Sequence, residues 1–295
     1  MENAARRPPL RSTSRVLDIS IASDQTSEPA PSLGPNHQVD LEGCEGLDRV
    51  YSMRLKHDAK RLVRRFGFDV VRFPIHDATA RTAQLLSYYG IDSVLDVGAN
   101  DGGFASEIRQ HGFNGRIISF EPTGDQYQAL RRRAGSDPKW ECVRRALGDS
   151  DAEVTINISG NSGLSSSVLP MLEAHVAAAP SSRYVSSERV QQQRLDHIFP
   201  ELDIARDSRV FLKIDVQGYE RQVLDGASGL FSNGLIVGLQ LELSLVPLYQ
   251  DAMPYDEALE HARNLGMALM GLDPVLADPQ SGRLLQADAV FFAEQ

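Results

Sequence analysis

The fold of this chain is decided by the stretch Ser93-Val-Leu-Asp-Val-Gly-Ala-Asn-Asp-Gly-Gly-Phe104. Its first five residues are mostly apolar, as in a short buried strand, and Gly98 and Gly102 allow the backbone to turn sharply and to approach a ligand closely. A second strand follows at Ile117-Ile-Ser-Phe-Glu-Pro122 and ends on the carboxylate of Glu121. In nucleotide-binding α/β units, a carboxylate in this place accepts hydrogen bonds from the two hydroxyls of a ribose. The two segments therefore predict a nucleoside site.

An acidic residue inside the first segment distinguishes between two classes of nucleoside cofactor. Asp96 lies two residues before Gly98, in the pattern Asp-x-Gly-x-x-x-Gly, whereas a dinucleotide site favours Gly-x-Gly-x-x-Gly. A carboxylate is repelled by a pyrophosphate, but it is attracted by the ammonium and the sulfonium of S-adenosylmethionine (SAM). We therefore expect SAM, with Glu121 on the ribose and Asp96 reaching the ammonium directly or through water. The backbone from Gly98 to Asn100 should line the methionine portion, and Gly102 should complete the cofactor-binding turn.

Motifs along the rest of the chain resemble the FkbM-type SAM-dependent methyltransferases, from about residue 92 to the C-terminus. Their order and spacing carry the resemblance more than any single motif does. The matching segments are Val94-Leu-Asp-Val-Gly-Ala-Asn100, Phe120-Glu-Pro122, Ala146-Leu-Gly148, Asn161-Ser-Gly163, Arg194-Leu-Asp196 and Leu212-Lys-Ile-Asp-Val-Gln-Gly-Tyr-Glu220. The resemblance implies a Rossmann-like class I methyltransferase fold, which is an α/β architecture with a mostly parallel seven-stranded sheet and helices on both faces.

Composition disfavours several classes of protein. With 295 residues, of which 42% are hydrophobic, the chain can bury one full core, so we expect one α/β domain with appendages. A formal net charge of −10 disfavours a nucleic-acid partner, which usually requires a basic face. The two cysteines lack disulfide or metal spacing, and the longest apolar stretch, Gly234 to Leu243, is too short for a transmembrane segment. We therefore expect a cytoplasmic protein, and we leave open whether it forms a homo-oligomer.

The N-terminal part differs in composition from the rest. Residues 1–44 are rich in proline, serine and alanine, which predicts a disordered tail. Residues 45–90 are expected to form a helical extension, with a basic helix from Leu47 to Phe66 and a second helix from Ala78 to Tyr89. The basic face could bind a membrane surface or a partner, but we favour a solvated face of a helix packed on its own domain. The methyltransferase domain should then occupy 91–295.

Strand and helix patterns alternate along this domain, as expected for a mostly parallel sheet. The expected strands are 93–97, 116–120, 140–145, 152–158, 209–215, 235–242, 266–271 and 288–293. The expected helices are 103–111, 124–134, 218–226 and 254–265. The region 159–190 interrupts the alternation with a sequence that is rich in serine and alanine and too long for a plain connection. We expect either a lid over the site or a mobile surface loop there.

Two ionisable residues lie inside the apolar strand Phe211-Leu-Lys-Ile-Asp-Val216. Lys213 and Asp215 are two residues apart, so their side chains share one face, and Asp215 reaches the carboxyl end of the strand. Such residues are costly to bury unless they are paired or functional. A structural ion pair is one interpretation, and the one we favour is a catalytic role, with either residue orienting or deprotonating the acceptor. Glu242 occupies the comparable position on the next strand and is expected to hold the substrate.

Weaker candidates complete the expected site. Asp149 follows the third strand, at the place where the resemblance implies a contact with adenine, although an aspartate in a Gly-Asp-Ser-Asp turn often serves only the turn. His175, within 159–190, could act as a general base at neutral pH. No metal-binding spacing is present: Asp215 and Glu242 could contribute to a divalent-cation site, but a third ligand is not identifiable.

The resemblance implies methyl transfer from SAM to a hydroxyl oxygen of a small-molecule, sugar or glycolipid acceptor in a biosynthetic pathway. The alternatives are N-methyl transfer by the same fold, a nicotinamide-dependent oxidoreductase, and a non-catalytic binding or scaffold module. Asp96 and the missing Gly-x-Gly-x-x-Gly disfavour the oxidoreductase, and the intact cofactor residues disfavour the scaffold. N-methyl transfer is the closest alternative, although the chain lacks an Asn/Asp-Pro-Pro-aromatic motif.

Overall fold

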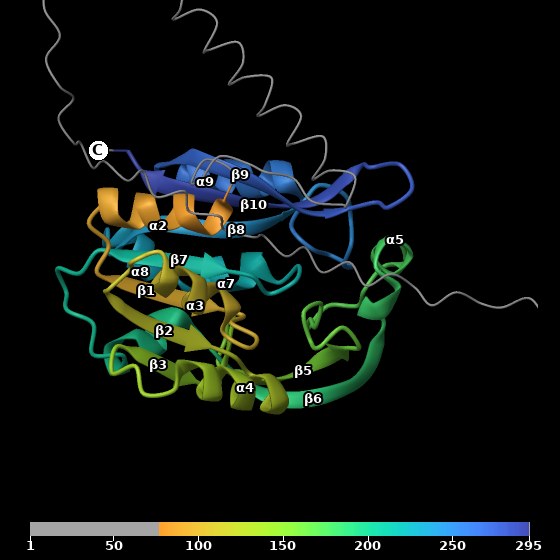
Figure 1. The fold of residues 1–295 in the computed structure, drawn as a ribbon, viewed down its shortest axis with the longest axis horizontal. Helices are drawn as coiled ribbons and strands as arrows, with labels where there is room; N and C mark the ends of the chain where they lie inside the picture. The colour runs from red at the N-terminus through yellow and green to blue at the C-terminus, as the bar shows by residue number, and fades with distance from the viewer. Residues whose placement is uncertain (1–76, 295) are drawn as a thin grey trace, which may run out of the picture. The chain divides into compact units, whose positions relative to one another are not determined.

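A seven-stranded, mostly parallel sheet organises the part of the chain that the computed structural model describes, residues 77–294 (Figure 1). In spatial order the strands are β3 (Trp140–Val143), β2 (Arg116–Phe120), β1 (Ser93–Val97), β7 (Val210–Ile214), β8 (Ile236–Ser244), β10 (Leu284–Ala293) and β9 (Met267–Ala277). This arrangement confirms the predicted Rossmann-like α/β fold. Within the same residues, every helix is too short or too polar to cross a membrane.

The strand order places a crevice at the carboxyl ends of β1 and β7. The chain builds β1, β2 and β3 toward one edge and then returns to add β7 on the other side of β1. β1 is parallel to β2 and to β7, and β7 is parallel to β8. β10 runs antiparallel to both of its neighbours, β8 and β9. In sheets of this kind ligands bind where the strand order reverses, which is here between β1 and β7.

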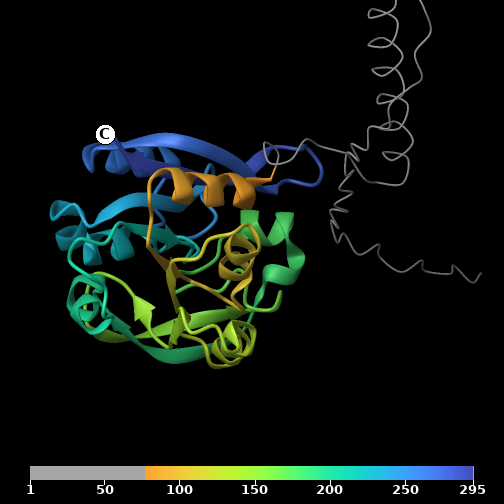
Figure 2. The same cartoon turned by 60° about the vertical axis from the view of Figure 1, so that its left-hand side comes forward.

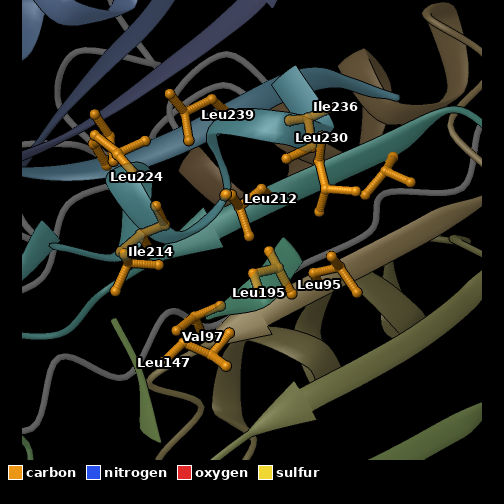
Figure 3. Packing of buried hydrophobic residues seen from close by; sticks show 14 of the residues in the cluster. Leu95, Val97, Leu147, Leu195, Leu212, Ile214, Leu224, Leu230, Ile236 and Leu239 are labelled. Atoms are coloured by element: carbon orange, nitrogen blue, oxygen red, sulfur yellow. The ribbon is translucent and has the colours of Figure 1, made fainter. Parts of the chain in front are cut away.

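Alternating residues of the central strands fill two apolar layers, one on each face of the sheet. Leu95, Val97 and Leu212 belong to the first layer, shown in Figure 3, whereas Val94 and Phe211 belong to the second. The first layer is covered by α6 (Leu195–Ile198), α7 (Glu220–Gly226), α8 (Ser228–Ser232) and α9 (Tyr255–Asn264). The second is covered by α2 (Ala78–Tyr88), α3 (Gly103–Gln110) and α4 (Gly124–Ala134). Each fully buried leucine in these layers stabilises the fold by about 2 kcal/mol.

Helix α2 completes the second layer. Asp77 caps its N-terminus, because Asp77 Oδ1 accepts a hydrogen bond from the backbone N–H of Ala80 at 2.8 Å. Leu86 is fully buried in the apolar layer that α2 shares with α3. Figures 1 and 2 show α2 beside β9 and β10, and an ion pair between Arg81 of α2 and Asp273 of β9 joins the two elements. The helix expected in this place is therefore confirmed.

A second sheet of three strands borders the region that interrupts the alternation. Its order is β4 (Ala146–Leu147), β6 (Tyr184–Gln193) and β5 (Ala152–Ser159). The sequence predicts a lid or a loop throughout 159–190, but its last residues form β6, which pairs antiparallel with β5. Half of the side chains of β6 are exposed, and its sequence lacks the apolar alternation of a half-buried strand. The helix α5 (Glu173–Ala178) lies between the two strands in the chain.

The other expected strands and helices agree with the structure within a few residues, except that β9 and β10 are longer. β9 continues to Ala277, well beyond the expected end at residue 271. It lies at the edge of the sheet, where Pro274 is tolerated although it interrupts the strand pattern. The short helices α6 and α8 are not predicted by the sequence. The tail expected over 1–44 and the basic helix expected over 47–66 lie outside the described residues.

Gly98 packs so closely on the end of β7 that a side chain there should destabilise the fold. Its φ is +77°, and a Cβ would lie 1.9 Å from the carbonyl oxygen of Asp215. Gly112 is a matched control, because its φ is +92° and a Cβ there would meet open space. We expect Gly98→Ala to lower the free energy of unfolding by about 3 kcal/mol or more, against about 1 kcal/mol for Gly112→Ala. Urea denaturation measures both losses, and equal losses would contradict this account.

Candidate functional site

Two cavities open at the carboxyl ends of β1 and β7. The Glu121 cavity is lined by the ends of β1, β2, β4 and β7 and by part of the 159–190 region. The Lys213 cavity is lined by the starts of α2 and α3 and by side chains of β7, β8, β9 and β10. The residues that line both cavities are Gly98, Asn100, Leu164 and Asp215. A ligand in one cavity can therefore meet a ligand in the other at these residues.

Glu121 presents a nearly buried carboxylate to the first cavity. Its Oε1 accepts hydrogen bonds from the backbone N–H and the hydroxyl of Thr123, at 2.9 and 2.6 Å, and its Oε2 accepts one from the N–H of Asn100 at 2.9 Å. Burial raises the pKa of Glu121 to about 7, although these hydrogen bonds act in the opposite direction. A carboxylate has about four acceptor positions, so this one can accept a further hydrogen bond from a ligand hydroxyl.

The turn between β1 and α3 lines both cavities with its backbone. The N–H of Gly98 donates a hydrogen bond to the carbonyl oxygen of Phe120 at 3.0 Å, which ties the turn to the end of β2. Asn100 has a φ of +48°, in the left-handed region, and its Nδ2 donates to the carbonyl oxygen of Ser162 at 3.3 Å. The turn is thus fixed between β2 and the segment that follows β5.

Lys213 lies between two carboxylates. Its Nζ is 3.4 Å from Asp96 Oδ1 and 3.2 Å from Asp215 Oδ2, and it also lies 5.3 Å from the centre of the Phe104 ring. The strand register places Asp96 next to Lys213 on one side and next to Ser119 on the other. Ser119 Oγ donates to Asp96 Oδ2 at 3.1 Å. Asp96 Oδ2 therefore has a hydrogen-bond donor, whereas its buried Oδ1 has no hydrogen bond and faces only the charge of Lys213.

Lys213, Asp96 and Asp215 differ in what they can do to a ligand. Burial by itself lowers the pKa of Lys213, but the carboxylates of Asp215 and Asp96 outweigh it and raise the pKa. Lys213 is therefore charged at neutral pH and cannot accept a proton. Burial raises the pKa of Asp96, which Lys213 opposes. Asp215 exposes 35% of its side chain and lines both cavities, so it is the member that can act on a ligand.

Gln217 holds the oxygen of Asp215 that Lys213 does not contact. Its Nε2 donates to Asp215 Oδ1 at 3.0 Å and to Glu242 Oε2 at 2.7 Å. The hydroxyl of Tyr249 donates to Gln217 Oε1 at 2.7 Å, which fixes the orientation of the amide. Since each oxygen of Asp215 has its own donor, the plane of this carboxylate is fixed at the junction of the two cavities.

Residues 160–168, which we call the cover segment, contribute to the wall of the Glu121 cavity. The carbonyl oxygen of Ser162 accepts a hydrogen bond from Gln126 Nε2 of α4 at 2.9 Å. Ser167 Oγ donates to the carbonyl oxygen of Gln217 at 2.7 Å. The cover segment is therefore tied both to α4 and to the end of β7. A lid over the cavity is expected to form such hydrogen bonds to the rest of the domain, whereas a mobile surface loop is expected to lack them.

Three residues that the sequence places in the site lie outside both cavities. Asp149 is exposed, and its Oδ1 accepts a hydrogen bond from the hydroxyl of Ser150 at 3.1 Å, which fits the alternative of turn chemistry. Gly102 is the N-cap of α3 with a φ of +85°, and a Cβ there would meet packed side chains. His175 is buried on α5 with Nε2 3.3 Å from Ser165 Oγ, and burial lowers its pKa. The expected roles of all three stay predictions.

Asp96 and Glu242 lie behind the cavities, because neither is part of the lining. The carboxylate of Asp96 is fully buried among protein groups. Its contact with a ligand ammonium, directly or through water, stays a prediction. Glu242 accepts hydrogen bonds from Gln217 and from Gln286 Nε2, the latter at 2.8 Å. Burial, with the nearby Asp215 carboxylate, raises the pKa of Glu242 well above its usual value. Glu242 thus supports Gln217, and its expected contact with the substrate stays a prediction.

Sequence reasoning missed several residues of the site. Thr123, Gln217 and Tyr249 are not among the predicted site residues, although each donates a hydrogen bond to a group in or next to the Glu121 cavity. The spacing of Gln217, two residues after Asp215, was an available signal. Tyr249 carries no local signal. Among residues 77–294, no group of three His, Cys, Asp or Glu side chains is arranged to hold a metal ion.

Comparison with known proteins identifies a family. The profile described as the methyltransferase FkbM domain matches residues 96–268, which is more than half of the chain. Comparison with curated proteins found no match. One similar solved structure is 1,6-didemethyltoxoflavin-N1-methyltransferase of Burkholderia thailandensis with bound 1,6-didemethyltoxoflavin and S-adenosylhomocysteine. The two sequences are 12% identical, the match covers 90% of this chain and 95% of that chain, and the TM-score is 0.38. Another is an rRNA methylase from Streptococcus thermophilus, which is 12% identical, with 77% of this chain and 99% of that chain covered and a TM-score of 0.41.

Loss of Lys213 alone should destabilise the protein more than loss of the whole ion pair. Lys213→Met leaves Asp96 fully buried without its cation, which costs about 3 kcal/mol or more. The double variant Asp96→Asn/Lys213→Met removes both charges and should recover at least about 1 kcal/mol of that loss. Urea denaturation of the wild type, the two single variants and the double variant measures this coupling. Strictly additive losses would show that the two side chains do not stabilise each other.

Proposed function

Because this chain belongs to the FkbM methyltransferase family, whose methyl donor is SAM, we propose that it methylates a hydroxyl oxygen of a small-molecule, sugar or glycolipid acceptor. The observation that carries this proposal is the position of Asp215, which lines both cavities and is held by Lys213 and Gln217. Deprotonation of an alcohol needs a base within hydrogen-bond reach of the reacting oxygen. A fixed carboxylate at the junction of two cavities meets that requirement.

The Glu121 cavity suits SAM. Glu121 would accept a hydrogen bond from the ribose, since its carboxylate has an acceptor position left. The backbone of Gly98 and Asn100 would line the methionine portion, and the apolar side chains of Leu147 and Ile156 would contact the adenine. When bound, SAM supplies a methyl group that its sulfonium activates toward displacement. The acceptor would then occupy the Lys213 cavity, on the other side of Asp215.

In this arrangement Asp215 would act as the base. It would take the hydroxyl proton of the acceptor as the acceptor oxygen receives the methyl group, and the leaving sulfur would keep the electron pair of the carbon–sulfur bond. Lys213 stabilises the negative charge of Asp215 and orients Oδ2, whereas Gln217 orients Oδ1. Lys213 is itself charged, so it positions the base and does not replace it.

N-methyl transfer is a second candidate, favoured by the acidic lining of the Lys213 cavity. Asp215, Asp273 and Asp288 line this cavity together with the cation of Lys213. These carboxylates attract an amine acceptor in its protonated form, and Asp215 could take the proton that such an amine must lose before it reacts. The ¹³C chemical shift of the transferred methyl group in the product distinguishes an O-methyl from an N-methyl product.

SAM affinity should decrease as the pH falls through about 7. The pKa of Glu121 is raised to about 7, and a protonated carboxyl offers fewer acceptor positions to a ribose hydroxyl. Below that pH, the Kd should rise by up to about tenfold for each pH unit until the pKa of the bound state is reached. Calorimetric titration from about pH 5.5 to about pH 8.5 measures this dependence.

Glu121→Gln provides the control, because its amide does not titrate. This variant should bind SAM more weakly at high pH and lack the Glu121-dependent fall in affinity. The amino group of SAM titrates with both proteins, so the difference between the two profiles isolates Glu121. Identical profiles would contradict the ribose contact.

Asp215→Asn should lose methyl transfer without losing SAM. We expect a rate at least about 100-fold lower, because the amide cannot accept the proton, and a Kd for SAM within about threefold of the wild type. Asp207→Asn is the control, since Asp207 is an exposed carboxylate outside both cavities. Transfer of labelled methyl groups to a panel of sugars, alkyl glycosides and amines measures the rate. Unimpaired turnover by Asp215→Asn would eliminate Asp215 as the base.

A further inference from the structure

A third cavity continues the Lys213 cavity along helix α2. The Tyr88 cavity, with a volume of about 440 Å³, is lined by α2 and by residues of β9 and β10. The residues that it shares with the Lys213 cavity are Ala78, Thr82, Asp273 and Val290. The Lys213 cavity is itself continuous with the Glu121 cavity at Asp215. The three cavities therefore form a series that leads from the cofactor site to the surface of α2 and β9.

The chemistry of the lining changes along this series. Charged side chains of Lys213, Asp215 and Asp288 line the cavity next to the transfer point. Farther along, the side chains of Leu85, Tyr88 and Met270 line the wall, together with Gln84 and the Arg81–Asp273 ion pair. A ligand that spans both cavities thus meets mostly charged groups near Asp215, the Arg81–Asp273 ion pair where the cavities join, and mostly apolar groups beyond it.

The apolar end is built on stacked aromatic rings. Tyr89 stacks on Phe292 with ring centres 4.1 Å apart and planes inclined by 13°, and Tyr88 packs edge-on against Tyr89 at 5.1 Å. Among the described residues, Tyr88 is 74% exposed and Met270 is 39% exposed. Rigid aromatic surface offers a large apolar contact area at low cost in conformational entropy. Contiguous apolar surface of this kind beside a cavity marks a binding site.

We propose that the methyl acceptor is an amphiphile, with a hydroxyl-bearing polar head in the Lys213 cavity and an apolar tail in the Tyr88 cavity. The position of the head rests on the proposed function, because the hydroxyl has to reach Asp215. A fully polar acceptor would leave the surface of Tyr88 and Met270 in water. A fully apolar acceptor would remove water from the charged side chains around Lys213 and offer them no hydrogen bond in return, which is unfavourable. An amphiphile avoids both costs.

A second copy of the chain is the rival occupant of the Tyr88 cavity. β9 is an edge strand, and its Leu269 and Leu272 are 48% and 52% exposed among the described residues, so another strand could pair there. The Tyr88 cavity is continuous with the Lys213 cavity. A contact between two copies would not need such a passage to Asp215, so this continuity favours the acceptor as the occupant. The oligomeric state is therefore measured in the same experiment.

Alkyl β-D-glucosides test the proposal with the full-length protein saturated with S-adenosylhomocysteine. Glucosides from methyl to octyl are titrated calorimetrically, each below its critical micelle concentration. A tail in the Tyr88 cavity should tighten binding by about twofold to fourfold for each added methylene group. A Kd that does not change with chain length would overturn the proposal, and sedimentation of the same samples would then show whether a second copy fills the cavity.

Two variants connect the chain-length effect to the cavity. Tyr88→Ser combined with Met270→Ser should abolish the dependence on chain length. Val185→Ser should retain it, because Val185 is 69% exposed on β6 and lies outside the three cavities. A dependence that survives the double substitution would place the tail elsewhere and overturn the proposal. The affinity for S-adenosylhomocysteine, measured in each protein, tests the cofactor site separately: its absence in the wild type would defeat the proposed function instead.

Discussion

The buried contact between Lys213 and Asp96 is the interaction on which the site depends. The two residues are register partners on β1 and β7, the strands between which the order of the sheet reverses. A buried charge is tolerated only with its partner in place, and a slip of one residue would turn Asp96 toward the opposite apolar layer. The same register brings Asp215 at the end of β7 against Gly98 in the turn after β1. The register of β1 and β7 therefore determines both the stability of the buried ion pair and the position of the proposed base.

The short strands that are buried on both faces were predictable from the sequence, whereas β6 and the second half of β9 were not. β1, β2 and β7 are short continuous apolar runs, which local patterns identify well. Half of the side chains of β6 are exposed, and it pairs with β5 through its backbone, so its side chains carry little strand signal. The second half of β9 contains Pro274, which an edge strand accepts, and the charged side chain of Asp273. The small sheet and the long edge therefore required the tertiary structure.

The residues of the site also divide into those that the sequence could place and those that it could not. Glu121, Asn100 and Asp215 stand at strand ends or in the turn that follows a strand, and the parallel sheet brings them to one edge, so the sequence could place them. Asp149 and His175 are also near strand ends or in the insertion, but their directions depend on how the second sheet packs, which no local pattern states. Short-range patterns locate the ends of strands, whereas the side chains that support a catalytic group come from several elements and are found only in the folded chain.

The ties of the cover segment have a kinetic consequence. Ser162 and Ser167 bind it to α4 and to the end of β7, across the wall of the Glu121 cavity. In the proposed arrangement, opening of these hydrogen bonds would free one wall of the cofactor cavity, whereas the Lys213 and Tyr88 cavities would give the acceptor a separate path along α2. Loop opening can then limit turnover even when the chemical step is fast. The exchange rates of the two ligands would then differ in their cause. Opening of the cover segment would set the rate for the cofactor, and diffusion along α2 would set the rate for the acceptor.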